Sequence, residues 1–427
     1  MTDARGRADG HRPAVHQVVA RLAPGDAIGH EVLGIQRALR TAGFVSEIVV
    51  EGADPAVEDL TVDYLDFVDQ IHDDDLLIHH FSLGSRASRM AYALRCRMIL
   101  VYHNITPAEY FIGIHDRLAR ECYHGRRELS AYPARVDLAL GDSEFNRLEL
   151  EAAGFSPTAV LPVVPDFSHL DAPADEHTLA AYDDDWTNIL FVGRIVPHKR
   201  PEDLIRFVDA YQRKYQPKTR LLLAGSAVEF ESYLAQLHGL VSRLGVREVN
   251  FLGRVTDREL SALYQVADLY LSASEHEGFC VPITEAFYKR VPVLAFAAGA
   301  VQATMDGGGR LFMSRDPRTV AAEMDRLLSS EDVEASTLAA QDAALARLRA
   351  RDFGRMLVEF VERTIAQPRR PLPGVAPGFW TEFRLAQEIE TIRETRPSAF
   401  HALPYAPDER AYRADFGAPA MSRGARR

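Results

Sequence analysis

Cysteine is scarce in this chain, with three residues in 427, at positions 96, 122 and 280. Their odd number and wide spacing, with no Cys-x-x-Cys pair, argue against a disulfide framework and a zinc site. No run of ~18 apolar residues occurs, so we expect no segment to span a membrane. The polar start of the chain lacks the apolar core of a signal peptide, so we expect a cytoplasmic protein.

Positive charge is also in short supply. Lys and Arg total 49 against 61 Asp and Glu, which gives a net charge of −12. Nucleic-acid binding depends on a basic surface, so we expect no nucleic-acid partner. Only four of the basic residues are lysines, so each lysine is of interest as a candidate functional group.

What the chain does have is apolar residues, at 47%, and a length that suits two domains. Short apolar segments alternate with helical periodicity in two blocks, and this alternation predicts parallel α/β sheets. We expect a disordered leader at 1–13, one domain at 14–168, a linker at 169–187 and a second domain at 188–366. Residues 367–427 read as a proline-rich crossing, one helix and a disordered tail.

The stretch 272–286, SASEHEGFCVPITEA, combines the end of a buried strand, a glycine-bearing turn and a helix that Pro282 opens. The N-terminus of a helix binds anions through its free backbone N–H groups. Glu277 and Glu285 flank this turn, and two carboxylates beside an anion site suit hydroxyl recognition next to a phosphate. A sugar nucleotide has both groups.

Four segments carry a resemblance to the retaining glycosyltransferases of family 4. They are FVGRIVPHKRPEDLI (191–205), SEHEGFCVPITEA (274–286), YHNITP (102–107) and GDSEFNRLEL (141–150). The likeness covers roughly residues 16–365. It implies a GT-B fold, in which two facing Rossmann-like, doubly wound domains enclose an inter-domain cleft.

The resemblance implies a role for five residues. Arg194 and Lys199 would grip the diphosphate and stabilise its charge as it leaves. Glu285 would accept hydrogen bonds from the ribose, and Glu277 would contact the donor sugar. His103, at the end of a strand, would face the donor sugar near the reacting carbon.

Further substrate-binding candidates are small residues and backbone groups of the loops that follow strands. Gly25 and Gly29 would let backbone amides approach the diphosphate or the acceptor. The full set is Gly25, Asp26, Gly29, Gly193, Gly225, Val255, Gly278, Phe279 and Cys280. The family more often has glycine where this chain has Cys280, so the sugar pocket is expected to differ there, with Cys280 in a packing role.

No metal or cofactor is expected. His79 and His80 are adjacent in a strand, so their side chains should point to opposite faces. The acidic runs 73–75 and 183–185 do not follow a strand, as an Asp-x-Asp metal motif must, and they read as solvated loops.

We therefore expect a retaining glycosyltransferase that moves a sugar from a nucleoside-diphosphate sugar, UDP- or GDP-linked, to an acceptor hydroxyl. The acceptor could be a saccharide, a lipid-linked molecule or a small molecule, in cell-envelope polysaccharide or specialised-metabolite synthesis. Arginine-rich helices at 86–97 and 115–135 leave open a weak peripheral membrane contact. The alternatives are an epimerase or hydrolase of the same fold, and a non-catalytic donor-binding subunit.

Overall fold

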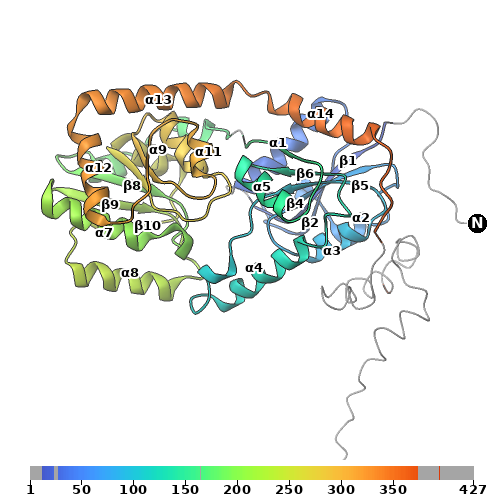
Figure 1. Cartoon of the computed structure of the whole chain (residues 1–427), viewed down its shortest axis with the longest axis horizontal. Coiled ribbons are helices and arrows are strands. Elements are labelled where there is room, and N and C mark those ends of the chain that lie inside the picture. Colours follow the sequence, from blue (N-terminus) through green and yellow to red (C-terminus); the bar gives the residue numbers. More distant parts are fainter. Residues whose placement is uncertain (1–11, 24–26, 164, 374–393, 395–427) are drawn as a thin grey trace, which may run out of the picture.

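Two parallel α/β domains make up the part of the chain that the computed structural model describes, residues 12–23, 27–163, 165–373 and 394 (Figure 1). The first domain has a seven-stranded sheet in the order β3-β2-β1-β4-β5-β6-β7. Its strands are β1 (Val15–Leu22), β2 (Ile48–Ala53), β3 (Thr61–Asp63), β4 (Leu76–Phe81), β5 (Arg97–Tyr102), β6 (Leu138–Gly141) and β7 (Thr158–Val160).

Helices connect these strands and cover the sheet. They are α1 (Ala27–Thr41), α2 (Tyr64–Phe67), α3 (Arg86–Ala93), α4 (Asp116–Leu129) and α5 (Glu144–Ala152), with short 3-10 turns η1 (Glu58–Leu60) and η2 (Ala108–Tyr110). All paired strands are parallel, and the order changes direction at β1 and β4. Open sheets of this kind bind ligands beyond the carboxyl ends of their strands.

The second domain repeats the plan with six parallel strands in the order β10-β9-β8-β11-β12-β13. These are β8 (Thr187–Val192), β9 (Thr219–Ala224), β10 (Val249–Gly253), β11 (Leu269–Ser272), β12 (Val293–Phe296) and β13 (Arg310–Phe312). Its helices are α7 (Pro201–Lys214), α8 (Glu231–Leu244), α9 (Asp257–Val266), α10 (Val281–Tyr288), α11 (Val301–Met305) and α12 (Pro317–Ser329), and the 3-10 turn η4 (Pro197–Lys199) precedes α7.

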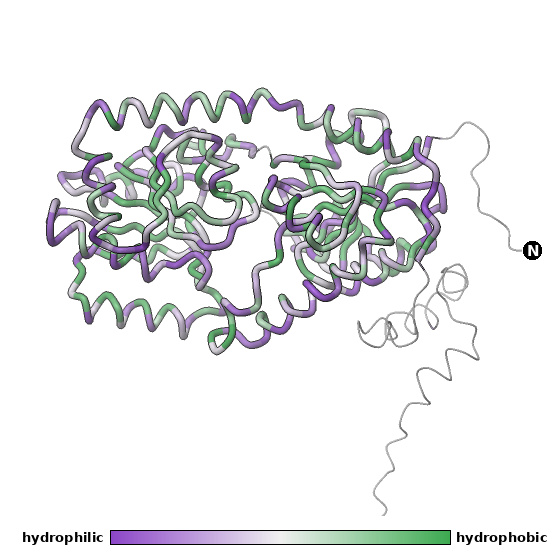
Figure 2. The backbone as a smooth tube through the Cα atoms, viewed as in Figure 1, coloured by the Kyte–Doolittle hydropathy of each residue, from purple (hydrophilic) through white to green (hydrophobic). Residues whose placement is uncertain are grey.

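The central strands are buried on both faces, which explains their nearly continuous apolar sequence. Every residue of β4 and of β9 is buried. Figure 2 shows hydrophobic residues in the interior of both domains, where Figure 1 places the strands. The predicted fold class, two Rossmann-like domains, is confirmed.

The expected linker contains regular structure. The 3-10 turn η3 (Ser168–Asp171) and helix α6 (Glu176–Tyr182) lie largely within residues 169–187. Asp175 caps α6, because its carboxylate accepts a hydrogen bond from the amide of Thr178 at 2.8 Å. Leu170 is fully buried in the core of the second domain, so this segment packs as part of that domain.

The chain then returns to the first domain. Helix α13 (Glu331–Arg349) runs along the molecule, and α14 (Phe353–Ala366) lies beside the first domain (Figure 1). Leu357 and Val361 of α14 belong to the same buried cluster as Ile35 and Val101 of the first sheet and its helix. The second domain therefore ends before α14, and the last part of the expected range 188–366 packs against the first domain.

Most of the expected leader, residues 1–11, and the predicted tail helix and tail lie outside the described residues. Among the helices that are described, none has the length and apolar character needed to cross a membrane.

Candidate active site

Lys199 and Glu277 meet in the second domain. Lys199 ends the turn η4 after β8, and its Nζ lies 2.5 Å from Oε1 of Glu277. Burial opposes the charge on Lys199, but the carboxylate of Glu277 outweighs it and raises the pKa of Lys199. The ammonium group therefore stays charged, as a diphosphate ligand requires.

Arg194 follows the same strand and is exposed. Its guanidinium carbon lies 5.7 Å from the centre of the Phe230 ring, and it has no ion pair with any described residue. An arginine that is stacked on an aromatic ring and free of a carboxylate keeps its charge available for an incoming anion.

Gly193 and Gly225 explain why this loop is glycine-rich. A Cβ atom on Gly225 would lie 1.9 Å from the carbonyl oxygen of Gly193, closer than any real contact. The ends of β8 and β9 can approach one another only without side chains at this point. The two glycines thus position the backbone that leads into Arg194.

Cys280 occupies a strained position before α10. Its backbone is left-handed, with φ +76°, a conformation that glycine adopts without cost. This explains why the family usually has glycine here. Burial, with Glu277 next in effect, raises the pKa of the Cys280 thiol well above its usual value, so the thiol stays neutral as expected for a packing role.

Glu285 lies in α10 and is 7% exposed. Its Oε2 accepts a hydrogen bond from the hydroxyl of Tyr264 at 2.9 Å, and its Oε1 lies 3.0 Å from Nε2 of His169. The hydrogen bond to Glu285 raises the pKa of His169. Neither Tyr264 nor His169 was predicted from the sequence, because no fixed spacing connects them to the stretch 272–286.

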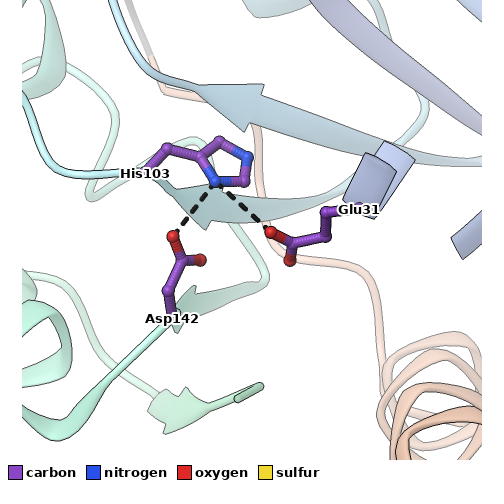
Figure 3. Close-up of side chains that lie close together, drawn as sticks. All are labelled: Glu31, His103 and Asp142. Atoms are coloured by element: carbon purple, nitrogen blue, oxygen red, sulfur yellow. Dashed lines mark hydrogen bonds and ion pairs between the residues drawn. The ribbon is translucent and has the colours of Figure 1, made fainter. Parts of the chain in front are cut away.

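His103 lies at the end of β5 within a buried acidic group (Figure 3). Its Nδ1 lies 3.1 Å from Oδ2 of Asp142, which follows β6, and 3.7 Å from Oε2 of Glu31 in α1. Three separate elements thus bring His103 and two carboxylates together. One oxygen of each, Oε1 of Glu31 and Oδ1 of Asp142, is buried without a hydrogen-bond partner among the described residues.

A chain of hydrogen bonds fixes the tautomer of His103. Gln17 Nε2 donates to the carbonyl of Val32 at 3.1 Å, which leaves its Oε1 to accept from His80 Nε2 at 2.9 Å. Burial holds the pKa of His80 well below its usual value, so His80 is neutral and its Nδ1 must accept from Nε2 of His103 at 2.9 Å.

It follows that a proton is needed where His103 faces Glu31 and Asp142. With Nε2 committed as a donor, Nδ1 of a neutral His103 would point a lone pair at two carboxylates. A proton on Nδ1 or on Asp142 removes the repulsion at the 3.1 Å contact, and a proton on Glu31 removes the repulsion at 3.7 Å. Burial, then the charge of Asp142, raises the pKa of Glu31 to about 8 against an opposing effect of His103, so Glu31 holds a proton at neutral pH.

The same three ligand atoms lie within 4.8 Å of one another and include donor types that a divalent cation accepts. The proton satisfies the group equally, so a metal-free site stays a prediction. His79 and His80 do point apart, as expected: His79 bonds Ser88 at 3.0 Å while His80 bonds His103.

The acidic group adjoins residues 273–280 across the domain interface. These residues form the loop between β11 and α10 that the resemblance expects to bind the sugar donor, and we call it the donor loop. Asn104, directly after His103, donates from Nδ2 to Asn146 at 2.9 Å and to the carbonyl of Glu277 at 3.4 Å. A Cβ on Gly278 would lie 3.0 Å from that of Asn104, so this glycine permits the close approach. The structure therefore brings His103, Glu277 and Gly278 together.

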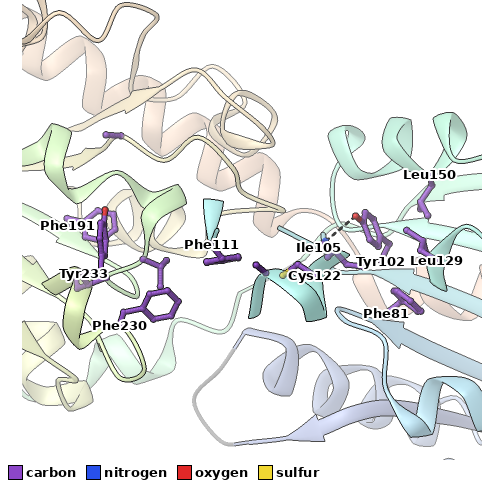
Figure 4. Packing of buried hydrophobic residues seen from close by; sticks show 14 of the residues in the cluster. Phe81, Tyr102, Ile105, Phe111, Cys122, Leu129, Leu150, Phe191, Phe230 and Tyr233 are labelled. Atoms are coloured by element: carbon purple, nitrogen blue, oxygen red, sulfur yellow. Dashed lines mark hydrogen bonds between the residues drawn. The ribbon is translucent and has the colours of Figure 1, made fainter. Parts of the chain in front are cut away.

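Aromatic residues also join the two domains (Figure 4). The ring of Phe111 lies 6.0 Å from that of Phe230 and 5.8 Å from that of His198. Burial, with Lys199 next in effect, holds the pKa of His198 well below its usual value, so this ring is neutral and packs as an aromatic. These contacts hold the turn after β8 against the first domain.

Five predicted positions remain to be placed. Phe279 is buried in the core of the second domain. Gly25 and Asp26 lie outside the described residues. Gly29 is in the first turn of α1, which begins at Ala27, and not in the preceding loop as expected. Val255 is half-buried in the loop between β10 and α9, directly before the capping box of Thr256.

With a site at the junction of two facing parallel α/β domains, the architecture is that of the GT-B glycosyltransferases. Residues 178–342 match the family model described as glycosyl transferases group 1. This match confirms the resemblance for this part of the chain.

Curated relatives match part of the chain. A D-inositol 3-phosphate glycosyltransferase of Corynebacterium aurimucosum is 33% identical over 147 residues, 34% of this chain and 35% of the relative. One from Frankia alni is 29% identical over 218 residues, 48% of this chain and 52% of the relative. The chain thus spans about a third to a half of the length of these relatives.

Solved structures extend the likeness to both domains. Anabaena HepE in complex with UDP-glucose superposes with a TM-score of 0.64 at 18% identity, covering 82% of this chain and 100% of that one. At that identity the superposition shows the shared fold.

Proposed function

We propose that this protein is a retaining glycosyltransferase that moves a sugar from a nucleoside-diphosphate sugar to an acceptor hydroxyl. The observation that carries the proposal is the arrangement of Lys199, Glu277 and the exposed Arg194 next to the His103 group of the other domain. Cations for a diphosphate and carboxylates for hydroxyls thus lie on the two sides of one interface.

The charges support a front-face reaction. Arg194 and Lys199 would stabilise the negative charge that builds up on the departing diphosphate, and this diphosphate would take the proton of the acceptor. Glu277 would receive the hydroxyls of the transferred sugar, and Glu285 those of the ribose. No protein nucleophile is required, and the neutral thiol of Cys280 offers none.

The His103 group would bind the acceptor. The unpartnered oxygens of Glu31 and Asp142 are buried beside the donor loop, and a polyhydroxyl substrate, whose hydroxyl groups both donate and accept, would satisfy them. The HepE structure contains UDP-glucose, which favours UDP among the donors. Another solved structure of this fold, WaaG, is described as involved in lipopolysaccharide biosynthesis, which favours a cell-envelope acceptor.

The test is turnover by variants of the diphosphate cations. With a donor selected by thermal-shift screening of UDP- and GDP-sugars, Arg194→Ala and Lys199→Ala should each lower kcat by roughly 10²–10³, the usual cost of losing one charge-stabilising group. Exposed Lys214 provides a matched control, since Lys214→Ala should leave kcat unchanged.

The products separate the alternatives. Release of free sugar at the same rate without an acceptor would indicate a hydrolase, and accumulation of an epimeric sugar would indicate an epimerase. Donor binding without any turnover over a panel of acceptors would indicate a binding subunit. Unchanged donor binding by Glu285→Ala would refute the assignment of Glu285 to the ribose.

A further inference from the structure

A cationic hollow lies at the amino ends of strands β5 and β6 of the first sheet, opposite the candidate active site. Its volume is about 90 Å³, and its charged lining consists of Arg95, Arg97, Arg135, Arg369, Arg370 and Asp137. Arg97 begins β5 and Asp137 precedes β6, whereas His103 and Asp142 follow those same strands. The hollow is therefore separated from the donor and acceptor groups by the length of a strand, roughly 20 Å.

Backbone carbonyls hold most of these arginines and do not neutralise them. Arg97 donates to the carbonyl of Gln367 at 2.6 Å, and Arg370 donates to those of Val136 and Ser156 at 3.2 and 2.7 Å. Buried Arg135 donates to three carbonyls of the segment that ends at Cys96.

Carboxylates are few in this place. Arg95 pairs with Asp73 at 3.4 Å, and Asp137 is engaged with the amide of Met98 at 2.9 Å. Arg369 makes no hydrogen bond or ion pair with the described chain. Five guanidinium groups thus face one carboxylate within the lining and one outside it, Asp73, so positive charge is in excess among the described residues.

One donor is visibly left over. Nη1 of Arg97 is buried and has no hydrogen-bond partner within the described residues. Burial, opposed by Asp137 and reinforced by Arg369, lowers the pKa of Arg97. A buried guanidinium donor without a partner is costly, and an anion in the hollow would satisfy it.

We propose that this hollow binds a phosphate group. Guanidinium forks match phosphate oxygens in geometry and charge, and the volume suits one small anion. The site joins the starts of β5 and β6 to residues 367–372, the segment that follows α14, so a bound phosphate would fasten this returning segment to the first domain. The phosphate could belong to a small soluble molecule or to a phospholipid headgroup.

The experiment measures binding of inorganic phosphate and pyrophosphate to the full chain by calorimetry. The Arg194→Ala variant removes a diphosphate cation of the proposed donor site and should keep the phosphate binding. Arg369→Ala should weaken it at least tenfold, and Arg369→Lys should restore part of it. The matched control is Arg318→Ala, an exposed arginine of α12.

Vesicles distinguish the two sources. Co-sedimentation with phosphatidic acid in phosphatidylcholine vesicles, lost in Arg369→Ala, would identify a headgroup site, whereas binding of phosphate alone would identify a soluble ligand. Absence of saturable phosphate binding in Arg194→Ala, or binding that Arg369→Ala and Arg97→Gln leave unchanged, would overturn the proposal. An unchanged circular dichroism spectrum and melting temperature of each variant show that the fold is retained.

Discussion

Glu31 should make the stability of this protein fall as the pH rises, and Glu31→Gln should remove that dependence. Its folded pKa is about 8 against its usual 4.5, because it is buried beside Asp142. Between these values the folded chain holds a proton that the unfolded chain releases, so this contribution is complete below pH 4.5 and is lost as the pH rises through 8.

The magnitude follows from the two pKa values. In the pH range where Glu31 is ionised in the unfolded chain but protonated in the folded chain, each pH unit lowers the free energy of unfolding by about 1.4 kcal/mol. Between about pH 5.5 and 8.5 the loss from Glu31 is about 3 kcal/mol, an upper value because His103 and Asp142 share the same proton. The glutamine that replaces Glu31 in the variant is neutral at every pH and keeps the size of the side chain.

Urea denaturation at about pH 5.5, 7.0 and 8.5 measures the effect. The difference in unfolding free energy between Glu31→Gln and the wild type should move in favour of the variant by up to ~3 kcal/mol across this range. The control Glu359→Gln alters an exposed glutamate of α14 and should give a constant difference. A difference for Glu31→Gln that is equally constant would refute the raised pKa and the shared proton.

Three further predictions concern the donor side. Gly225→Ala should abolish donor binding in calorimetry and lower the melting temperature, because the added Cβ would lie 1.9 Å from the carbonyl oxygen of Gly193. The control is Gly34→Ala in α1, where the nearest contact of the added Cβ is at 3.9 Å, and it should stabilise the protein by up to ~1 kcal/mol. Cys280→Gly should be more stable than Cys280→Ala by about 1 kcal/mol in urea denaturation, since only glycine relieves the left-handed backbone; equal stabilities would contradict the strain. Tyr264→Phe removes the hydrogen bond to Glu285 and should raise KM for the donor several-fold with little change in kcat, and an unchanged KM would place the ribose elsewhere.

The alternation of strands and helices, and the loops that follow the strands, could be predicted from the sequence alone. Strand and helix periods are local, so β8 and α7, which lie on either side of Arg194 and Lys199, could be placed from a short stretch of residues. Pro201 opens α7 and Thr256 forms a capping box at α9, two helix starts that depend on neighbouring residues alone.

What the sequence could not supply was the grouping of residues from distant elements. Glu31 lies in a helix whose polar positions look solvated, and only the parallel order of β1, β4, β5 and β6 brings it to His103 and Asp142. Asp142 belongs to the segment 141–150, which the resemblance had singled out, but its contact with His103 depends on the register between β5 and β6. His169 was hidden in a segment that read as a linker, because a short 3-10 turn has no periodic signal.

The loop after β5 connects these observations. His103 turns inward to the acidic group, and Asn104 has a left-handed backbone, φ 64°, which asparagine tolerates better than most residues. This reversal sends the next residues outward, so that Asn104 reaches Glu277 and Phe111 reaches Phe230. A single loop thus sets both the place of His103 in the first domain and the contact with the donor loop of the second. Because the same backbone carries both, we expect a domain movement that shifts Glu277 to act on His103 as well, and donor binding would then change the geometry of the proposed acceptor group.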